Sequence, residues 1–388
     1  MSLWWVKKDQ LDAEQLDLIE NLGHLQNHLV IGPPGCGKTN ILLRRAQFVR
    51  TQEFPRVKVI TFTRTLTEFV KTGCYNAQGK EIFPRALVVT LEEFIRDIFT
   101  AAGESLPQEN DFLQRKKALA ERALELALAG NIPKYDVIFV DEGQDLSKEE
   151  VALLDGVSNN LFVVADSRQR IFEDGGGLTA IEALVPSENI HSLKFHYRIC
   201  PEICVVADRI LTSTGGQLLA DTQHYSGPTP GSVRANGPLD RIDQLETCAD
   251  RLVDQLRVYG DLIEQGDRIG IVVPRTTDRD DVMAYLESDT RLQGKAQIVR
   301  ARSGDSDDDH DVALDPQRPV LILTTKGAKG LEFRALHWLF CDELQHYQSR
   351  ELYYTIVTRA KTHLDFYFST DLPDVLAEAH AATDGELW

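Results

Sequence analysis

The stretch of sequence that decides the fold is HLVIGPPGCGKTNILLRRAQFVR, residues 28–50. It opens with a short apolar run that ends at Gly32, and after a glycine-rich loop the apolar side chains recur at helical spacing. The stretch therefore predicts a strand, a glycine loop and a helix in direct succession. Such a succession is typical of a parallel sheet whose strands alternate with covering helices.

The loop within this stretch, GPPGCGKT at residues 32–39, matches the pattern G-x-x-x-x-G-K-[ST]. In that pattern the backbone amides surround phosphate groups, the lysine neutralises phosphate charge, and the hydroxyl group binds magnesium. Lys38 and Thr39 occupy these two places. The sequence therefore predicts a phosphate-binding site made by Gly32, Pro33, Pro34, Gly35, Cys36, Gly37, Lys38, Thr39 and Asn40.

Short apolar or β-branched runs recur along the chain, with helical patterns between them. They lie at residues 57–62, 86–90, 137–140, 161–165, 269–273, 320–324, 335–340 and 364–368. We therefore expect an α/β fold with two parallel-sheet domains, residues 1–191 and 192–388. Residues 112–129 are rich in Leu, Ala, Glu, Lys and Arg, which predicts a small helical insertion at about residues 95–133.

The composition narrows the class of protein. The chain has 388 residues, enough for two domains, and 43% of them are hydrophobic. Because it shows neither a signal-peptide pattern nor a long uninterrupted apolar run, we expect a soluble, cytoplasmic protein. Six scattered cysteines favour reduced thiols. The net charge of -18 argues against coating of nucleic acid by bulk electrostatics, although a local basic channel stays compatible with it.

Two adjacent carboxylates follow the apolar run 137–140, in the sequence Asp141-Glu142-Gly-Gln-Asp145. Ligands of open α/β sheets bind at the carboxyl ends of the strands, where this pair would lie. Asp141 is therefore the candidate magnesium ligand. Glu142 is the candidate general base that orients and deprotonates an attacking water, since phosphoryl transfer depends on positioning and charge neutralisation.

Taken in order, these and further motifs resemble the UvrD/Rep/PcrA branch of superfamily 1 DNA helicases. The motif after the phosphate loop that carries the acidic pair, residues 141–145, is similar to DExQD of that family. The other similar segments are LDAEQ (11–15), TFTR (61–64), ADSRQRI (165–171), LKFHYR (193–198), TTKGAKGLEF (324–333) and LYYTIVTRA (352–360). The resemblance covers nearly the whole chain and implies two RecA-like domains that use ATP and Mg²⁺.

The resemblance also implies roles for single residues around the nucleotide. Tyr197 would stack on adenine, Gln15 would bind its edge, and Glu332, next to Gly330, would meet the ribose. Three further side chains would act at the γ-phosphate: Gln169, Arg198 and Arg359. Two alternatives stay open. The two arginines could form ordinary surface ion pairs, and Tyr197 and Phe195 could be aromatic residues of the core.

Nucleic-acid contacts are also implied by the resemblance. The residues at matching positions are Phe62, Thr63, Arg64, Thr90 and Lys326. Stacking of bases on an aromatic ring needs no sequence preference, which suits Phe62. The alternative is that Phe62 packs the end of its strand in the core.

The chain departs from the family pattern at several places. The tryptophan that stacks on a base after the GDxxQxI motif is missing, because Phe172 is followed by Glu173-Asp-Gly-Gly-Gly177. Only the stretch between Pro274 and Pro319 is available where larger relatives insert an accessory domain. We therefore expect a reduced core that depends on a protein partner for regulation or strand separation.

Two functional hypotheses follow. The first is an ATP-dependent motor that moves 3′ to 5′ on single-stranded DNA, and the second is a DNA-gated ATPase switch that signals to a partner such as a nuclease. RNA as the substrate is not excluded by the sequence. Two smaller features are interpreted as structural: the acidic segment 305–311 as a solvated loop, and Cys200 with Cys204 as core thiols.

Overall fold

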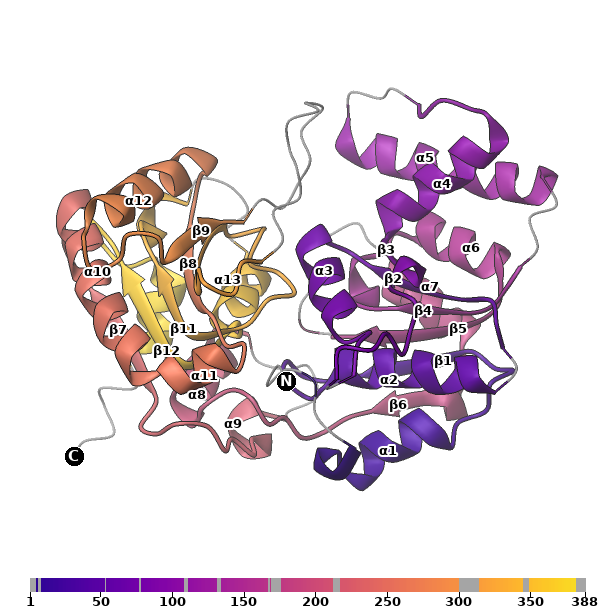
Figure 1. Ribbon diagram of the computed structural model, residues 1–388, viewed down its shortest axis with the longest axis horizontal. Coiled ribbons are helices and arrows are strands. Elements are labelled where there is room, and N and C mark those ends of the chain that lie inside the picture. The colour runs from indigo at the N-terminus through magenta and orange to yellow at the C-terminus, as the bar shows by residue number, and fades with distance from the viewer. Residues whose placement is uncertain are drawn as a thin grey trace. The chain divides into compact units, whose positions relative to one another are not determined.

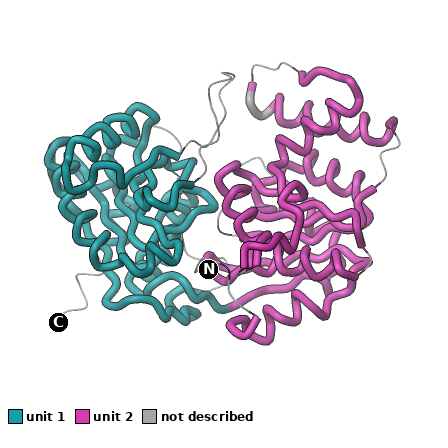
Figure 2. The backbone as a smooth tube through the Cα atoms, viewed as in Figure 1, with its two compact units in different colours: residues 1–5, 195–388 teal, residues 6–194 magenta. Residues whose placement is uncertain are grey.

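The computed structural model describes residues 5, 8–52, 54–76, 78–107, 111–130, 134–166, 168, 176–211, 217–299, 314–344 and 349–381, with the backbone only at 112 and 113. The chain forms two compact units (Figure 2). The N-terminal unit is residues 6–194, and the C-terminal unit is residues 195–388 together with residues 1–5. Each unit is described by itself.

The N-terminal unit is built on a fully parallel six-stranded sheet in the order β3-β2-β4-β5-β1-β6 (Figure 1). Its strands are β1 (His28–Ile31), β2 (Val57–Thr61), β3 (Val88–Thr90), β4 (Tyr135–Val140), β5 (Ser158–Ala165) and β6 (Ile190–Ser192). The central strands β4 and β5 are almost continuously buried, because helices cover both faces of a parallel sheet. Ile60 of β2 pairs with Val140 of β4, so the loops that follow these two strands start side by side.

The α-helices in the described residues of this unit are α1 (Ala13–Glu20), α2 (Lys38–Thr51), α3 (Arg64–Thr72), α4 (Leu91–Ala102), α5 (Phe112–Ala129), α6 (Lys148–Gly156) and α7 (Gly177–Leu184). Helices α4 and α5 lie between β3 and β4 in the sequence and pack together next to α6 (Figure 1). Their apolar side chains, among them Phe94, Phe99 and Ala123, join the core under the sheet. This helical arm is therefore part of the same packed unit as the sheet.

The C-terminal unit contains a second parallel six-stranded sheet, in the order β7-β12-β11-β8-β10-β9 (Figure 1). Its strands are β7 (Ser232–Asn236), β8 (Ile269–Val273), β9 (Ala296–Ile298), β10 (Val320–Thr324), β11 (Phe333–Trp338) and β12 (Ala360–Tyr367). Its helices are α8 (Pro201–Ile210), α9 (Leu219–Thr222), α10 (Arg241–Val258), α11 (Gly260–Glu264), α12 (Thr276–Ser288), α13 (Arg350–Val357) and α14 (Asp374–His380). Two apolar clusters, centred on Trp338 and on Ile271, form its core.

The predicted fold class, two parallel α/β sheets with a short helical insertion, is confirmed. Strands β1, β8 and β10 have the expected bounds, whereas Phe340 lies beyond β11 and adopts a positive φ of 55°. Strands β6, β7 and β9 were not expected from the sequence. Each of them lies at a sheet edge, and none consists of the continuous apolar run that marks a central strand.

Other sequence expectations can be compared with the described residues. Cys200 and Cys204 lie in the core of the C-terminal unit, as interpreted, and none of the six cysteines is in a disulfide. None of the helices in the described ranges is both long and apolar enough to cross a bilayer. The acidic segment 305–311 lies outside the described residues.

A buried histidine gives the C-terminal unit a testable pH dependence. His337 on β11 is fully buried, with Nδ1 2.9 Å from the Tyr367 hydroxyl and Nε2 2.8 Å from Oε1 of Gln255. Burial, assisted by nearby basic groups, lowers the pKa of His337 from 6.5 to about 3. At pH 5 the His337 side chain is therefore protonated in the unfolded chain and neutral in the folded chain. The free energy of unfolding consequently decreases as the pH falls below 6.5.

Replacing His337 with glutamine should accordingly weaken the pH dependence of stability. Between pH 7 and pH 5 the wild type should lose about 2 kcal/mol more of its free energy of unfolding than His337→Gln, since 1.5 pH units correspond to ~2 kcal/mol. Urea unfolding of both proteins at the two pH values measures this difference. An equal loss in both proteins would mean that His337 is protonated in the folded state.

Candidate active site

The glycine loop joins β1 to α2 in a conformation that requires glycine. Gly35 and Gly37 have φ angles of 79° and 88°, a region that side chains disfavour. At Gly32 a Cβ atom would come within 2.6 Å of the Cys36 sulfur. Gly37 begins α2 without a side-chain cap, so the first amides of the helix face the loop with their positive dipole end. This arrangement suits an anionic phosphate.

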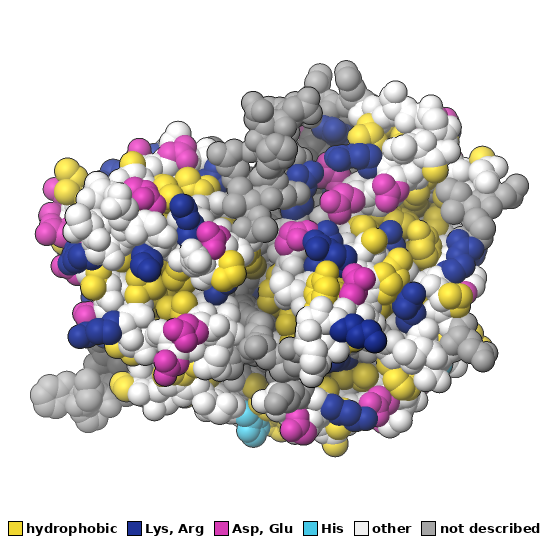
Figure 3. Space-filling model, viewed as in Figure 1, with side chains coloured by type: hydrophobic (Ala, Val, Ile, Leu, Met, Phe, Trp, Pro, Cys, Tyr) yellow, Lys and Arg dark blue, Asp and Glu magenta, His cyan; other side chains and the backbone are white. Residues whose placement is uncertain are grey.

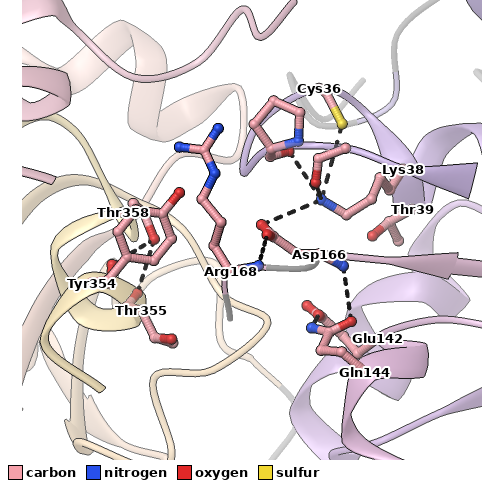
Figure 4. A network of polar contacts seen from close by, with 12 residues as sticks. Cys36, Lys38, Thr39, Glu142, Gln144, Asp166, Arg168, Tyr354, Thr355 and Thr358 are labelled. Atoms are coloured by element: carbon pink, nitrogen blue, oxygen red, sulfur yellow. Dashed lines mark hydrogen bonds and ion pairs between the residues drawn. The ribbon is translucent and has the colours of Figure 1, made fainter. Parts of the chain in front are cut away.

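The Lys38 ammonium lies inside this loop (Figure 4). It donates to the carbonyl oxygens of Gly32 and Pro33 at 2.8 and 2.9 Å, and it lies 3.7 Å from a carboxylate oxygen of Asp166. Burial acts to lower the pKa of Lys38, but the Cys36 sulfur and nearby carboxylates outweigh it and raise the pKa. Lys38 therefore stays a cation that can exchange weak carbonyl partners for phosphate oxygens.

Thr39 and Asp141 come together although 102 positions separate them in the sequence. The Thr39 hydroxyl donates to Oδ2 of Asp141 at 2.8 Å, and the Asp141 side chain is buried. Burial and the neighbouring Glu142 carboxylate raise the pKa of Asp141 well above its usual range. A divalent cation would relieve this crowding of negative charge, so the hydroxyl and the carboxylate fit the predicted Mg²⁺ ligands.

Glu142 sits in a strained backbone conformation directly after β4. Its φ of 53° and ψ of 44° are left-handed, which a non-glycine residue adopts at a cost of about 1–3 kcal/mol. The Gln144 amide donates to a carboxylate oxygen of Glu142 and accepts from the backbone amide of Asp166 at 3.0 Å (Figure 4). Gln144 therefore fixes the orientation of the candidate base against the end of β5.

Asp166 and Gln144 are two residues of this network to which the sequence interpretation gave no role. Asp166 follows β5, is buried, and contacts both Lys38 and the amide of Arg168, the latter at 2.9 Å. Its position after an apolar strand was the available signal, the same one that singled out Asp141. The Gln169 side chain, expected at the γ-phosphate, lies outside the described residues.

Gln15 lies against the glycine loop, as the resemblance implied for a residue near the nucleotide. Its amide donates to the Cys36 carbonyl at 2.9 Å, and its carbonyl accepts from the amide of Asp12 at the start of α1. Arg45 of α2 holds α1 in place by donating to carbonyl oxygens at its end, including that of Gly23 at 2.9 Å. Contact of Gln15 with adenine stays a prediction.

The predicted nucleotide residues of the C-terminal unit fall into two groups. Phe195 and Tyr197 are 44% and 38% exposed and both pack against the ring of His224, which excludes the alternative of core aromatics. Arg198 forms an ion pair with Glu332 and donates to the Thr358 carbonyl at 3.1 Å. Neither side chain of this pair is a surface group, because each is less than a fifth exposed.

The second arginine and its neighbours complete that unit's candidate residues. Arg359 is 4% exposed and donates to the carbonyl of Thr355 at 3.0 Å, so it too is not a surface ion pair. Gly330 has a positive φ of 80°, and the Lys326 side chain is exposed. The Glu332 carboxylate also lies 3.9 Å from the Lys361 ammonium. The roles of these residues toward a nucleotide or a nucleic acid stay predictions.

The candidate nucleic-acid residues of the N-terminal unit lie at the ends of β2 and β3. Thr63 caps α3, and Thr90, which is 4% exposed, caps α4 through the amide of Glu93. Phe62 packs partly against the core, which agrees with the alternative that it fills the end of its strand. Part of its side chain nevertheless stays exposed. Thr90 is thus occupied as a cap, whereas Phe62 and Arg64 are half-buried and stay candidates.

Comparisons with known proteins agree with this site. Residues 15–174 match the family described as an AAA domain, whereas no curated protein matches the chain. Among solved structures, the chain is similar to the C-terminal domain of a possible DNA helicase from Lactobacillus plantarun WCFS1, at 21% identity over 48% of this chain and 95% of that one. The TM-score of 0.33 is too low to carry an argument. Residues 15–174, which match the AAA domain, contain the glycine loop, Asp141, Glu142 and Asp166, so this part of the chain resembles an AAA-type P-loop domain.

Proposed function

We propose that this chain is an ATP-dependent 3′–5′ translocase or helicase on single-stranded DNA. The observation that carries the ATPase part is a set of polar contacts in the N-terminal unit, of which Figure 4 draws those between Lys38, Asp166 and Gln144. It links Thr39 to Asp141, Glu142 to Gln144, Gln144 to Asp166, and Asp166 to Lys38. A network of this composition supplies a cation for phosphate, a metal ligand pair and an oriented carboxylate within one rigid unit.

Each residue has one task in the proposed hydrolysis. The loop amides and Lys38 bind the β- and γ-phosphates, and Thr39 with Asp141 would hold Mg²⁺, which supplies charge neutralisation. Glu142 accepts the proton of the attacking water, and Gln144 holds its carboxylate in place. The left-handed backbone of Glu142 is then part of this positioning.

The C-terminal unit supplies the remaining groups in this proposal. Tyr197 stacks on adenine, Glu332 binds the ribose, and Arg198 with Arg359 stabilises the charge that develops on the γ-phosphate. The ion pair between Arg198 and Glu332 supports this in one respect, because it holds the partly buried guanidinium of Arg198 in a fixed position. Binding of nucleotide by Glu332 would then release Arg198.

We propose that single-stranded DNA binds through a few specific contacts and not through the net charge of the whole protein. The net charge is -18, and on the face visible in Figure 3 basic and acidic side chains are interspersed. Affinity would therefore come from base stacking, worth about 1–3 kcal/mol per base, with few phosphate contacts. Phe62, Arg64 and Lys326 are the candidates. Because RNA has the same kinds of bases and phosphates, it would use the same contacts, and it is tested beside DNA in the ATPase measurement.

The second candidate function is a DNA-gated ATPase switch that works with a protein partner such as a nuclease. The observation that favours it is the short connection between β8 and β10, where the described residues contain only α12 and β9 as regular elements. A large accessory domain therefore has no room at this place. Without such a domain, strand separation would depend on the partner.

ATP turnover with and without nucleic acid separates these functions. We expect single-stranded DNA to raise the steady-state ATPase rate strongly at low salt, and displacement from a 3′-tailed duplex to be weak for the chain alone. Movement against a streptavidin block at the strand end distinguishes the translocase from the switch. A turnover rate indifferent to DNA and RNA would contradict both, and robust displacement would contradict the need for a partner.

A further inference from the structure

Lys116, in the helical arm, joins three parts of the N-terminal unit. Its ammonium lies 2.9 Å from the carboxylate of Glu150 and donates to the Asp145 carbonyl at 3.1 Å. It also lies over the ring of Phe62, 5.1 Å from the centroid, within the range of a cation–π interaction. One cation from α5 thus contacts the residue after β2, the turn after β4 and the start of α6.

The contact with Asp145 leads directly to the candidate base. Asp145 ends the 3-10 turn Gly143–Asp145 that follows Glu142, and its amide donates to the Glu142 carbonyl at 3.0 Å. Glu142 is the residue with the left-handed backbone, so small shifts of this turn change the direction of its carboxylate. Two successive hydrogen bonds, from Lys116 to Asp145 and from Asp145 to Glu142, therefore connect the ammonium to the candidate base.

The contact with Glu150 fixes where Lys116 can lie. The Glu150 side chain is 3% exposed, and its carboxylate also accepts from the amide of Ser147 at 2.8 Å to cap α6. Burial raises the pKa of Glu150, while Lys116 acts to lower it. A lysine side chain held by a buried carboxylate has little conformational freedom. A change at the Phe62 ring therefore moves the Asp145 carbonyl instead of only rearranging the lysine in solvent.

We propose that Lys116 is the positioning residue that couples nucleic-acid occupancy at Phe62 to the catalytic turn Glu142–Asp145. This proposal rests on the proposed function and adds its route of regulation. A base that stacks on Phe62 changes the ring contact of Lys116, and Lys116 then shifts the Asp145 carbonyl and the turn that carries Glu142. Stimulation of ATP hydrolysis by nucleic acid would pass through this one ammonium.

The test removes the charge of Lys116 and measures stimulation. Lys116→Met keeps an unbranched, uncharged side chain one heavy atom shorter, and the double variant Lys116→Met with Glu150→Gln avoids leaving a buried carboxylate alone. We expect basal turnover within about twofold of wild type, whereas stimulation by a saturating deoxythymidine oligonucleotide falls about 5- to 150-fold, the usual range of coupling between sites. The oligonucleotide Kd, from fluorescence anisotropy, should change little. Lys116→Arg should restore stimulation.

A neighbouring lysine provides the matched control. Lys117 on the same helix is 54% exposed and lies 3.8 and 3.7 Å from Glu121 and Glu149, so Lys117→Met should keep wild-type stimulation. Wild-type stimulation in Lys116→Met, or an equal fall of basal and stimulated turnover, would overturn the proposal while leaving the proposed function intact. A wild type that nucleic acid does not stimulate would instead refute the nucleic-acid part of that function, and this coupling with it.

Discussion

Replacing Glu142 with glutamine should lower kcat for ATP about 10²- to 10⁴-fold while leaving ATP binding nearly unchanged. The glutamine keeps the size of the side chain and its contact with Gln144, but it cannot accept a proton from water. Lys38→Ala should also abolish turnover, yet by a different route, because it removes the cation that binds phosphate. Phosphate release gives kcat, and a fluorescent ATP analogue gives Kd.

The two variants therefore separate chemistry from binding. Glu142→Gln should bind the analogue as tightly as wild type, and Lys38→Ala should bind it more weakly. Glu121→Gln is the control, since Glu121 is 55% exposed on α5 and pairs with Lys117 of the same helix. Near-normal kcat in Glu142→Gln would mean that another group takes the proton, and Asp166 would be the first alternative to examine.

The sequence was sufficient to predict the central part of the fold and the glycine loop between β1 and α2. Buried parallel strands such as β4, β5 and β8 need long apolar runs, and these runs can be recognised in the amino-acid sequence. The glycine loop is equally local, since its geometry depends on Gly35 and Gly37 within a few residues. The edge strands β6, β7 and β9 were missed because pairing with a neighbour, rather than their own composition, makes them strands.

The part of the site that the sequence did not reveal depends on contacts between distant segments. Gln144 connects Glu142 to Asp166 only because β4 and β5 are adjacent, which the order β2-β4-β5 of the sheet decides. Lys116 reaches the catalytic turn because α5 packs on α6. A lysine within a charged helix has no sequence feature that distinguishes it from Lys117. Such residues are found only when the tertiary contacts are known.

Removing Arg198 or Arg359 should lower kcat about 10³- to 10⁵-fold, the range observed when an arginine is supplied to developing phosphoryl charge. The Kd for ATP should change far less, because these contacts form in the transition state rather than in the ground state. Arg359 is buried and Arg198 is 14% exposed, and both are already oriented by carbonyl oxygens, Arg198 by that of Thr358 and Arg359 by that of Thr355. Preorganised cations of this kind lose little entropy when they bind phosphate.

The control for this prediction is an arginine of the same unit with a comparable hydrogen bond. Arg350 is 49% exposed, donates to the Ile210 carbonyl at 3.1 Å and pairs with Glu378, so Arg350→Ala should keep normal turnover. Arg198→Ala also removes the nearer of the two cations beside Glu332, and thermal unfolding of each variant separates loss of stability from loss of catalysis. If a variant raised KM and left kcat unchanged, the wild-type arginine would bind ATP equally in the ground state and in the transition state. It would then have no part in the chemical step.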